Sequence, residues 1–189
     1  MHMNSADRFL GRWILITSCG WFIAQAVGNF VIKTLFPNTE FAALPTSPLY
    51  FAVFGAVFAL SQWICLRERI PNSFGWVLAT SIGLFVAALI IKLLNRSATI
   101  NAFLREIPFF VYLFGGMILG LAQYQAIKNL LQKASWWIII VSISWTLSQE
   151  IIRIHNPSVQ QLGVVFFATA TGVGLTWLTQ QSLSKTQTA

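Results

Sequence analysis

The sequence carries little charge for its length. Only 9% of its 189 residues are Asp, Glu, Lys or Arg, whereas 56% are hydrophobic. A soluble domain carries about 25% charged residues because its surface must be hydrated. The mean hydropathy of +0.69 therefore indicates that most of the surface faces lipid, and it excludes an ordinary soluble domain.

Histidine and cysteine are also scarce. The two histidines, His2 and His155, lie at the N-terminus and in a predicted loop. This excludes a bis-His haem, a His-ligated metal centre and most Ser-His or Cys-His mechanisms. Cys19 and Cys65 lie in apolar stretches without a CxxC pair, so no disulfide framework is expected. We expect no catalytic residues, no metal and no cofactor.

The five acidic residues are placed toward the ends of the apolar stretches. Glu150 is the deepest, and Arg153 follows it one turn later. We interpret them as a helix-end ion pair, since a proton pump or ion-coupled transporter would need an acid deeper in the membrane. The net charge of +7 does not indicate nucleic acid, because the basic residues are scattered and no run is longer than Arg67-Glu68-Arg69.

Six apolar stretches are each close to the roughly 17–25 residues that cross a bilayer as a helix. Proline falls between these stretches or at their first residue, where its missing N–H is tolerated. The sequence predicts an all-α polytopic membrane protein with one transmembrane domain, residues 1–181, and a polar C-terminal tail, residues 182–189. The predicted spans are 11–36, 49–66, 74–94, 108–131, 135–154 and 160–178.

The distribution of basic residues predicts the orientation. With the N-terminus inside, seven basic residues face the cytoplasm and five face outward, and both termini are cytoplasmic. The inner set is Arg8, Arg12, Arg67, Arg69, Lys128, Lys133 and Lys185, and the outer set is Lys33, Lys92, Arg96, Arg105 and Arg153.

Three segments share one pattern without gaps. Each opens with tryptophan, has serine five residues later and a small residue two positions beyond, and then a second small residue after four more. Small residues at this spacing let membrane helices approach closely, so Gly20, Gly83 and the related Gly116 are predicted at helix contacts. The segments begin Trp13…Ser18…Gly20, Trp76…Ser81…Gly83 and Trp137…Ser142…Ser144.

A second pattern precedes two of these segments. Gln62 and Gln123 each follow a glycine by seven residues and precede the next opening tryptophan by fourteen. Residues 168–172 hold a degraded version without glutamine. The simplest interpretation is three pseudo-repeated helix hairpins, with the last helix pairing with the first.

The combined pattern covers about residues 50–180. Gly-x6-Gln-(Trp/Tyr), a basic turn and Trp-x4-Ser-x-(Gly/Ser) resemble uncharacterised multi-pass membrane proteins of cyanobacteria and other bacteria. The resemblance implies a bacterial inner membrane, either plasma or thylakoid. It implies no activity, so no functional residues transfer.

Uncharged polar residues at membrane depth are the candidate site. They must face the bundle interior, because an unpartnered amide in hydrocarbon is costly. We favour interhelical hydrogen bonds, at about 0.6 kcal/mol each; a central pocket for a neutral ligand, or an amide ligand to a pigment metal, stays open. The candidates are Gln62, Gln123, Ser18, Ser81 and Ser142, supplemented by Gln25, Asn29 and Gln149.

Two function classes follow from these observations. The first is a non-enzymatic accessory or scaffold component that packs against lipid and other membrane proteins. The alternative is a small-molecule binding or transport module, comparable in size and helix number to the substrate-capture subunits of vitamin uptake systems.

Overall fold

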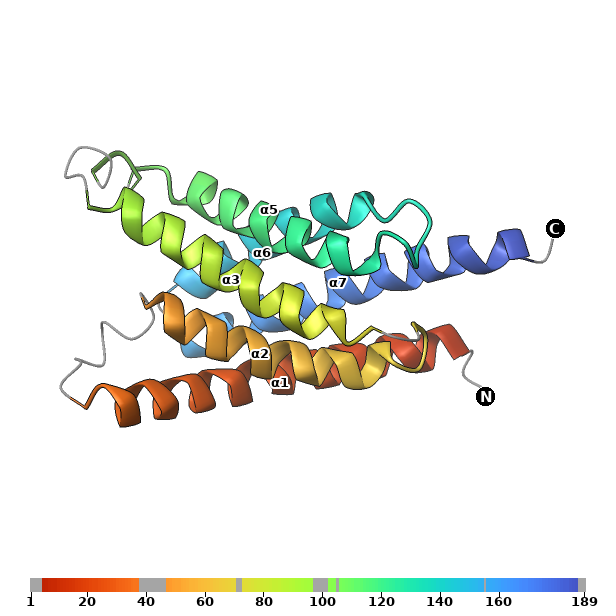
Figure 1. Cartoon of the computed structure of the whole chain (residues 1–189), viewed down its shortest axis with the longest axis horizontal. Helices are drawn as coiled ribbons and strands as arrows, with labels where there is room; N and C mark the ends of the chain where they lie inside the picture. Colours follow the sequence, from red (N-terminus) through yellow and green to blue (C-terminus); the bar gives the residue numbers. More distant parts are fainter. Residues whose placement is uncertain are drawn as a thin grey trace.

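The chain folds into long helices that run side by side (Figure 1). The computed structural model describes residues 5–37, 47–70, 73–96, 102–104, 106–154 and 156–186. No strand occurs in these ranges, and the predicted all-α fold is confirmed. The long helices are α1 (Ser5–Leu35), α2 (Pro48–Leu66), α3 (Gly75–Leu94), α5 (Pro108–Ile127), α6 (Trp136–Arg153) and α7 (Pro157–Thr186). His2, Glu40, Arg105 and His155 lie outside the described residues.

The helix ends differ from the predicted spans, most at the start of α1, which begins at Ser5 and not at residue 11, and at the end of α7, which reaches Thr186 and not residue 178. Three helices begin with proline, at Pro48, Pro108 and Pro157, because the first turn needs no donor from that residue. Pro48 and Pro157 thus begin helices, where the sequence suggested linkers. At the other end of the chain, α7 extends to Thr186, into the polar segment 182–189.

Five helices in the described part of the chain are long and apolar enough to cross a membrane, namely α1, α2, α3, α5 and residues Val159–Gln181 of α7. The sixth, α6, is more polar, because it carries serines, Gln149 and Glu150. Its serines Ser142, Ser144 and Ser148 are buried, whereas Ile139 and Ile143 are exposed. The polar face of α6 is turned into the bundle, and its outer face is as apolar as those of its neighbours.

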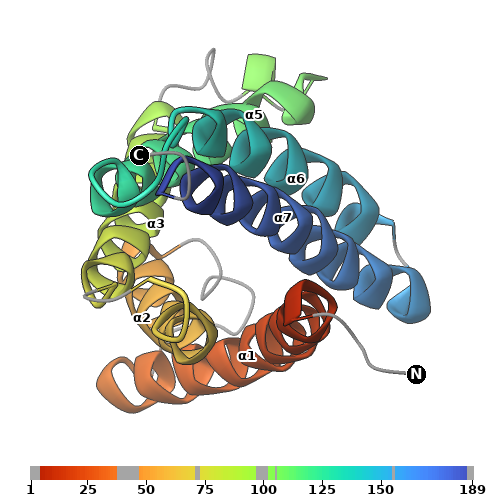
Figure 2. The ribbon, with the colours of Figure 1, turned by 90° about the vertical axis from the view of Figure 1, so that its right-hand side faces the viewer.

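The helices form a closed ring. Each long helix packs against the one before and the one after it, and α7 packs back against α1. Figure 2 looks along this ring from the end at which α1 begins and α7 ends. Residues 67–70 after α2 and the turn at 128–135 lie at that same end, which we call the terminal end (Figure 1). The opposite end, where α1, α3 and α6 finish, is the loop end.

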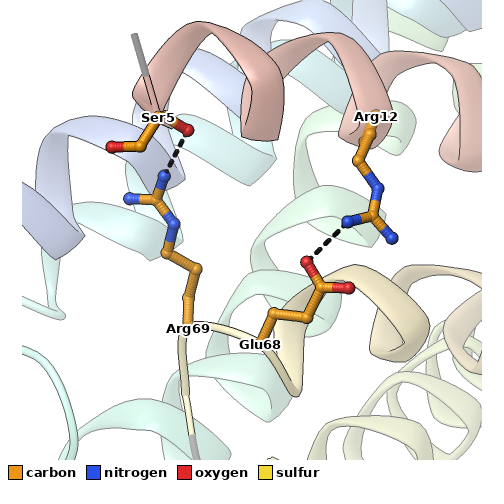
Figure 3. A network of polar contacts seen from close by, with 4 residues as sticks. All are labelled: Ser5, Arg12, Glu68 and Arg69. Carbon is orange, nitrogen blue, oxygen red and sulfur yellow. Dashed lines mark hydrogen bonds and ion pairs between the residues drawn. The ribbon is translucent and has the colours of Figure 1, made fainter.

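At the terminal end, α1 is tied to the turn after α2 (Figure 3). Arg12 Nη1 lies 2.7 Å from Glu68 Oε2, and Arg69 Nη2 donates to the Ser5 carbonyl at 2.7 Å. The Arg69 guanidinium also lies 4.7 Å from the centre of the Phe9 ring. These contacts hold the first turns of α1 against the neighbouring hairpin.

Candidate functional site

Three tryptophans form a buried layer in the half of the bundle near the terminal end. Trp76 Nε1 donates to Gln62 Oε1 at 3.0 Å, and Trp137 Nε1 donates to Gln123 Oε1 at 3.0 Å. The third indole makes the corresponding bond to α7, which has a threonine and not a glutamine at this position. We call these six residues the tryptophan layer: Trp13, Trp76, Trp137, Gln62, Gln123 and Thr171, the last of which accepts from Trp13 Nε1 at 3.2 Å.

The two glutamines are occupied by this layer. Gln123 also donates from Nε2 to Thr80 Oγ1 at 2.9 Å, so one amide links α5 to both α3 and α6. Gln62 and Gln123 are 1% and 2% exposed. Both amides therefore connect helices.

The three equivalent serines differ in their hydrogen bonds. Ser81 Oγ donates from α3 to the Ala52 carbonyl of α2 at 2.7 Å, whereas Ser142 Oγ donates to Ile138 O within α6 at 2.6 Å. Ser18 Oγ is buried and has no partner among the described residues. Like the two glutamines, these serines lie at helix contacts or in the packed interior.

The predicted glycines lie where helix backbones approach one another. A Cβ added to Gly116 would come within 2.9 Å of Ser142 Cα, and one added to Gly83 within 2.9 Å of Ala122 Cβ. At Gly20 an added Cβ would overlap the Ser61 side chain. A larger residue at any of these positions would force the helices apart.

The other half of the bundle, near the loop end, contains a cavity of about 590 Å³ bounded by α1, α2, α3, α5 and α6. Trp21 of α1 and Trp145 of α6 line it with ring centres 5.8 Å apart, and the ring centre of Phe54 lies 5.0 Å from that of Trp21. Small residues of α3 and α5, Ala88 and Gly115, also belong to the lining. The cavity therefore has largely apolar and aromatic walls.

A few polar side chains also line the cavity. Gln25 of α1 and Gln149 of α6 project onto it, and neither amide makes a side-chain hydrogen bond to any described residue. Their positions are equivalent, since each follows the lining tryptophan of its helix, Trp21 or Trp145, by four residues. Free amides on an aromatic wall are suited to bind one polar group of a ligand.

The cavity continues toward the loop end. A second hollow of about 450 Å³ shares Asn95 and Tyr112 with it and adds Arg153. Arg153 Nη2 lies 2.9 Å from Glu150 Oε2. Lys92, in the last turn of α3, lines the cavity itself and forms no ion pair within the described residues. We call the region around Lys92, Asn95 and Arg153 the mouth.

Comparison with known proteins adds no family to this description. No protein-family model, curated protein or solved structure matches the chain. The resemblance to cyanobacterial and other bacterial membrane proteins stays a prediction. No group of three or more His, Cys, Asp or Glu side chains that could hold a metal occurs in the described ranges.

The residues that the sequence suggested for a pocket are not the residues that line the cavity. Gln62, Gln123, Ser18, Ser81 and Ser142 do not line the cavity, whereas Gln25 and Gln149, named only as additions, do. Lys92 was counted only for orientation. A signal was present in the second tryptophan of two segments, Trp21 and Trp145, which stands eight residues after the first in each.

Proposed function

We propose that this membrane protein binds a small, mainly apolar molecule in the cavity near the loop end, and that it does so without catalysing a reaction. The observation that carries the proposal is the cavity of about 590 Å³ lined by Trp21, Phe54 and Trp145 together with the free amides of Gln25 and Gln149. Ligand sites in proteins span about 300–1,000 Å³ and combine apolar walls with a few polar groups.

The lining favours binding over chemistry. Aromatic side chains bury large apolar area and hold flat or aliphatic groups, and an amide offers both a donor and an acceptor to a polar substituent. The described lining contains no histidine or carboxylate that could act as a general base. We therefore assign Gln25 and Gln149 a role in orienting the ligand.

The architecture supports a rigid site. We infer that α2–α3, α5–α6 and α7–α1 descend from one two-helix unit, because the equivalent tryptophan in each donates from Nε1 to a side chain on the preceding helix. The tryptophan layer fixes one half of the ring. Because the tryptophan layer sets the spacing of the helices, the cavity in the half near the loop end stays open.

The proposed orientation places the mouth outside the cell. Arg12, Arg67 and Lys128 lie at the terminal end, together with most of the basic residues, and cytoplasmic loops retain such residues. In a bacterial inner membrane, plasma or thylakoid, the ligand would enter from the periplasmic or lumenal side.

Gly115→Leu tests the proposal. Gly115 lines the cavity, and a Cβ added there would lie 3.8 Å from Trp145 Nε1, an ordinary contact distance. The larger side chain should occupy the cavity without pushing helices apart. Protein purified from its native membranes should carry a bound small molecule, detected by mass spectrometry after extraction, and Gly115→Leu should have lost it.

Gly75→Leu is the matched control. Gly75 is an exposed residue in the other half, and the nearest atom to an added Cβ is Ala126 Cβ at 4.0 Å. This variant should keep the bound molecule. A different result would contradict the proposal: the parent carries no small molecule but copurifies with a stoichiometric protein partner, and Gly115→Leu keeps that partner. The accessory or scaffold role would then replace ligand binding as the function.

A further inference from the structure

Lys92 occupies an unusual position for a lysine at a helix end. It lies in the last turn of α3, where a cation favourably meets the negative end of the helix dipole. Lys33 holds the same place on α1 but does not line the cavity. Interaction with the dipole or the lipid surface would not require Lys92 to face an aromatic cavity, so its position there needs a further reason.

The charges around the mouth do not cancel. Arg153 is paired with Glu150, whereas Lys92 has no carboxylate partner among the described residues. Helix dipoles do not decide the sign either, because α3 and α6 end at the loop end while α2 and α5 begin there. Among the described residues that line the mouth, the charge without an ion-pair partner is the ammonium group of Lys92.

An apolar cavity with one cation at its rim suits a molecule that has an apolar body and one anionic group at its end. We propose that the ligand is a single-chain amphipathic anion whose carboxylate or phosphate binds Lys92 Nζ and whose apolar body packs against Trp21 and Trp145 in the cavity. This inference rests on the proposed function of the cavity. A cavity of about 590 Å³ matches a ligand of this size, not a phospholipid with two chains.

Two matched probes test the charge. ω-Bromododecanoate and ω-bromododecanol have the same chain, and bromine quenches the fluorescence of tryptophans that it approaches, such as Trp21 and Trp145. In detergent, the parent should bind the acid about tenfold more tightly than the alcohol, the size expected for one charge-assisted hydrogen bond. Lys92→Met should abolish this preference while the affinity for the alcohol stays the same.

Three variants make the result specific. Lys92→Arg should keep the preference for the acid. Arg96→Met should also keep it, because Arg96 lies beyond the same helix end and is not part of the cavity lining. Gly115→Leu should weaken binding of both probes, because it fills the space for the chain.

The other outcomes separate this inference from the proposed function. If the parent binds acid and alcohol equally and Gly115→Leu binds neither, the anionic ligand is overturned, while the proposed binding function of the cavity still holds. If neither probe quenches the fluorescence of the parent or of Gly115→Leu, both the anionic ligand and the binding function of the cavity are overturned. Displacement of the acid by dimyristoylphosphatidylglycerol, dependent on Lys92, would make a lipid headgroup the occupant and overturn the single-chain ligand.

Discussion

Two adjacent glycines on α5 show how the two halves of the bundle differ. An added Cβ on Gly116 would meet the backbone of Ser142 at 2.9 Å, whereas one on Gly115 would have Trp145 Nε1 at 3.8 Å as its nearest neighbour. In the half near the terminal end, small residues lie against another backbone and close the space. Near the loop end, Gly115 has no backbone of another helix within 4 Å of an added Cβ, and the space beside it stays open as the cavity.

The comparison teaches that small residues alone do not define a packing contact. What matters is how closely the neighbouring helix approaches at that position, whether with its backbone, as at Gly116, or with a small side chain, as at Gly83. The tryptophan layer adds directional bonds to the packed half, whereas in the hollow half the amides of Gln25 and Gln149 make no side-chain hydrogen bond to a described residue. The following predictions test this difference.

The largest expected effect concerns the side of the membrane that each end of the bundle faces. In a Cys19→Ser background, Arg96→Cys at the loop end should react with an impermeant thiol reagent in intact cells. Lys128→Cys at the terminal end should react only after lysis. Both positions are exposed. The reverse labelling pattern would put the cavity mouth in the cytoplasm.

The next largest effect distinguishes the two glycines directly. Gly116→Leu should lower the free energy of unfolding by roughly 3 kcal/mol, because the side chain must displace the backbone of α6. Gly115→Leu should lower it by less than about 1 kcal/mol, since its side chain enters the cavity. Unfolding in mixed micelles measures both, and equal losses would contradict the division into packed and hollow halves.

A smaller effect is expected within the tryptophan layer. Gln123→Leu removes the acceptor of Trp137 Nε1 and the donor to Thr80 Oγ1. Leaving two buried groups unpaired should cost about 1–2 kcal/mol. A double-mutant cycle with Trp137→Phe should show coupling, because each change removes the same bond. Independent, additive effects would mean that this bond contributes nothing to stability.

The smallest effect should come from the contacts in Figure 3. The Arg12 and Glu68 side chains are 52% and 46% exposed, so solvent screens their attraction. Glu68→Gln should change stability by only about 0.5 kcal/mol, and less in high salt. A loss above about 2 kcal/mol that persists in high salt would show that this end depends on the ion pair.

Much of the fold was predictable because helix length and hydropathy are local properties. The repeated tryptophans and the spacing from Gln62 to Trp76 also pointed to paired helices. The sequence could not assign the partner of Trp13, since Thr171 resembles neither Gln62 nor Gln123 in size. The sequence predicted a span at 135–154, but α6 is not among the five helices that are apolar enough to cross a membrane, because its mean hydropathy combines a buried polar face with an apolar outer face.

The cavity was not predictable from the same information. Its lining comes from five helices, and which side of each helix faces inward depends on how all of them pack together. Gln25 and Gln62 look alike in sequence, as polar residues within apolar spans. Their different surroundings arise from rotation of α1 and α2 in the ring, which no local pattern specifies.

The bond between Trp13 and Thr171 has a consequence for biosynthesis. These residues are 158 positions apart, whereas the other two tryptophans find their partners within one hairpin. A ribosome delivers helices in order, so α2–α3 and α5–α6 can complete their own bonds as they enter the membrane. The first helix, in contrast, must wait beside them with its indole unpaired until the last helix has been inserted. Chains that stop before α7 therefore leave α1 without its final neighbour, a defect that membrane quality-control proteases can recognise.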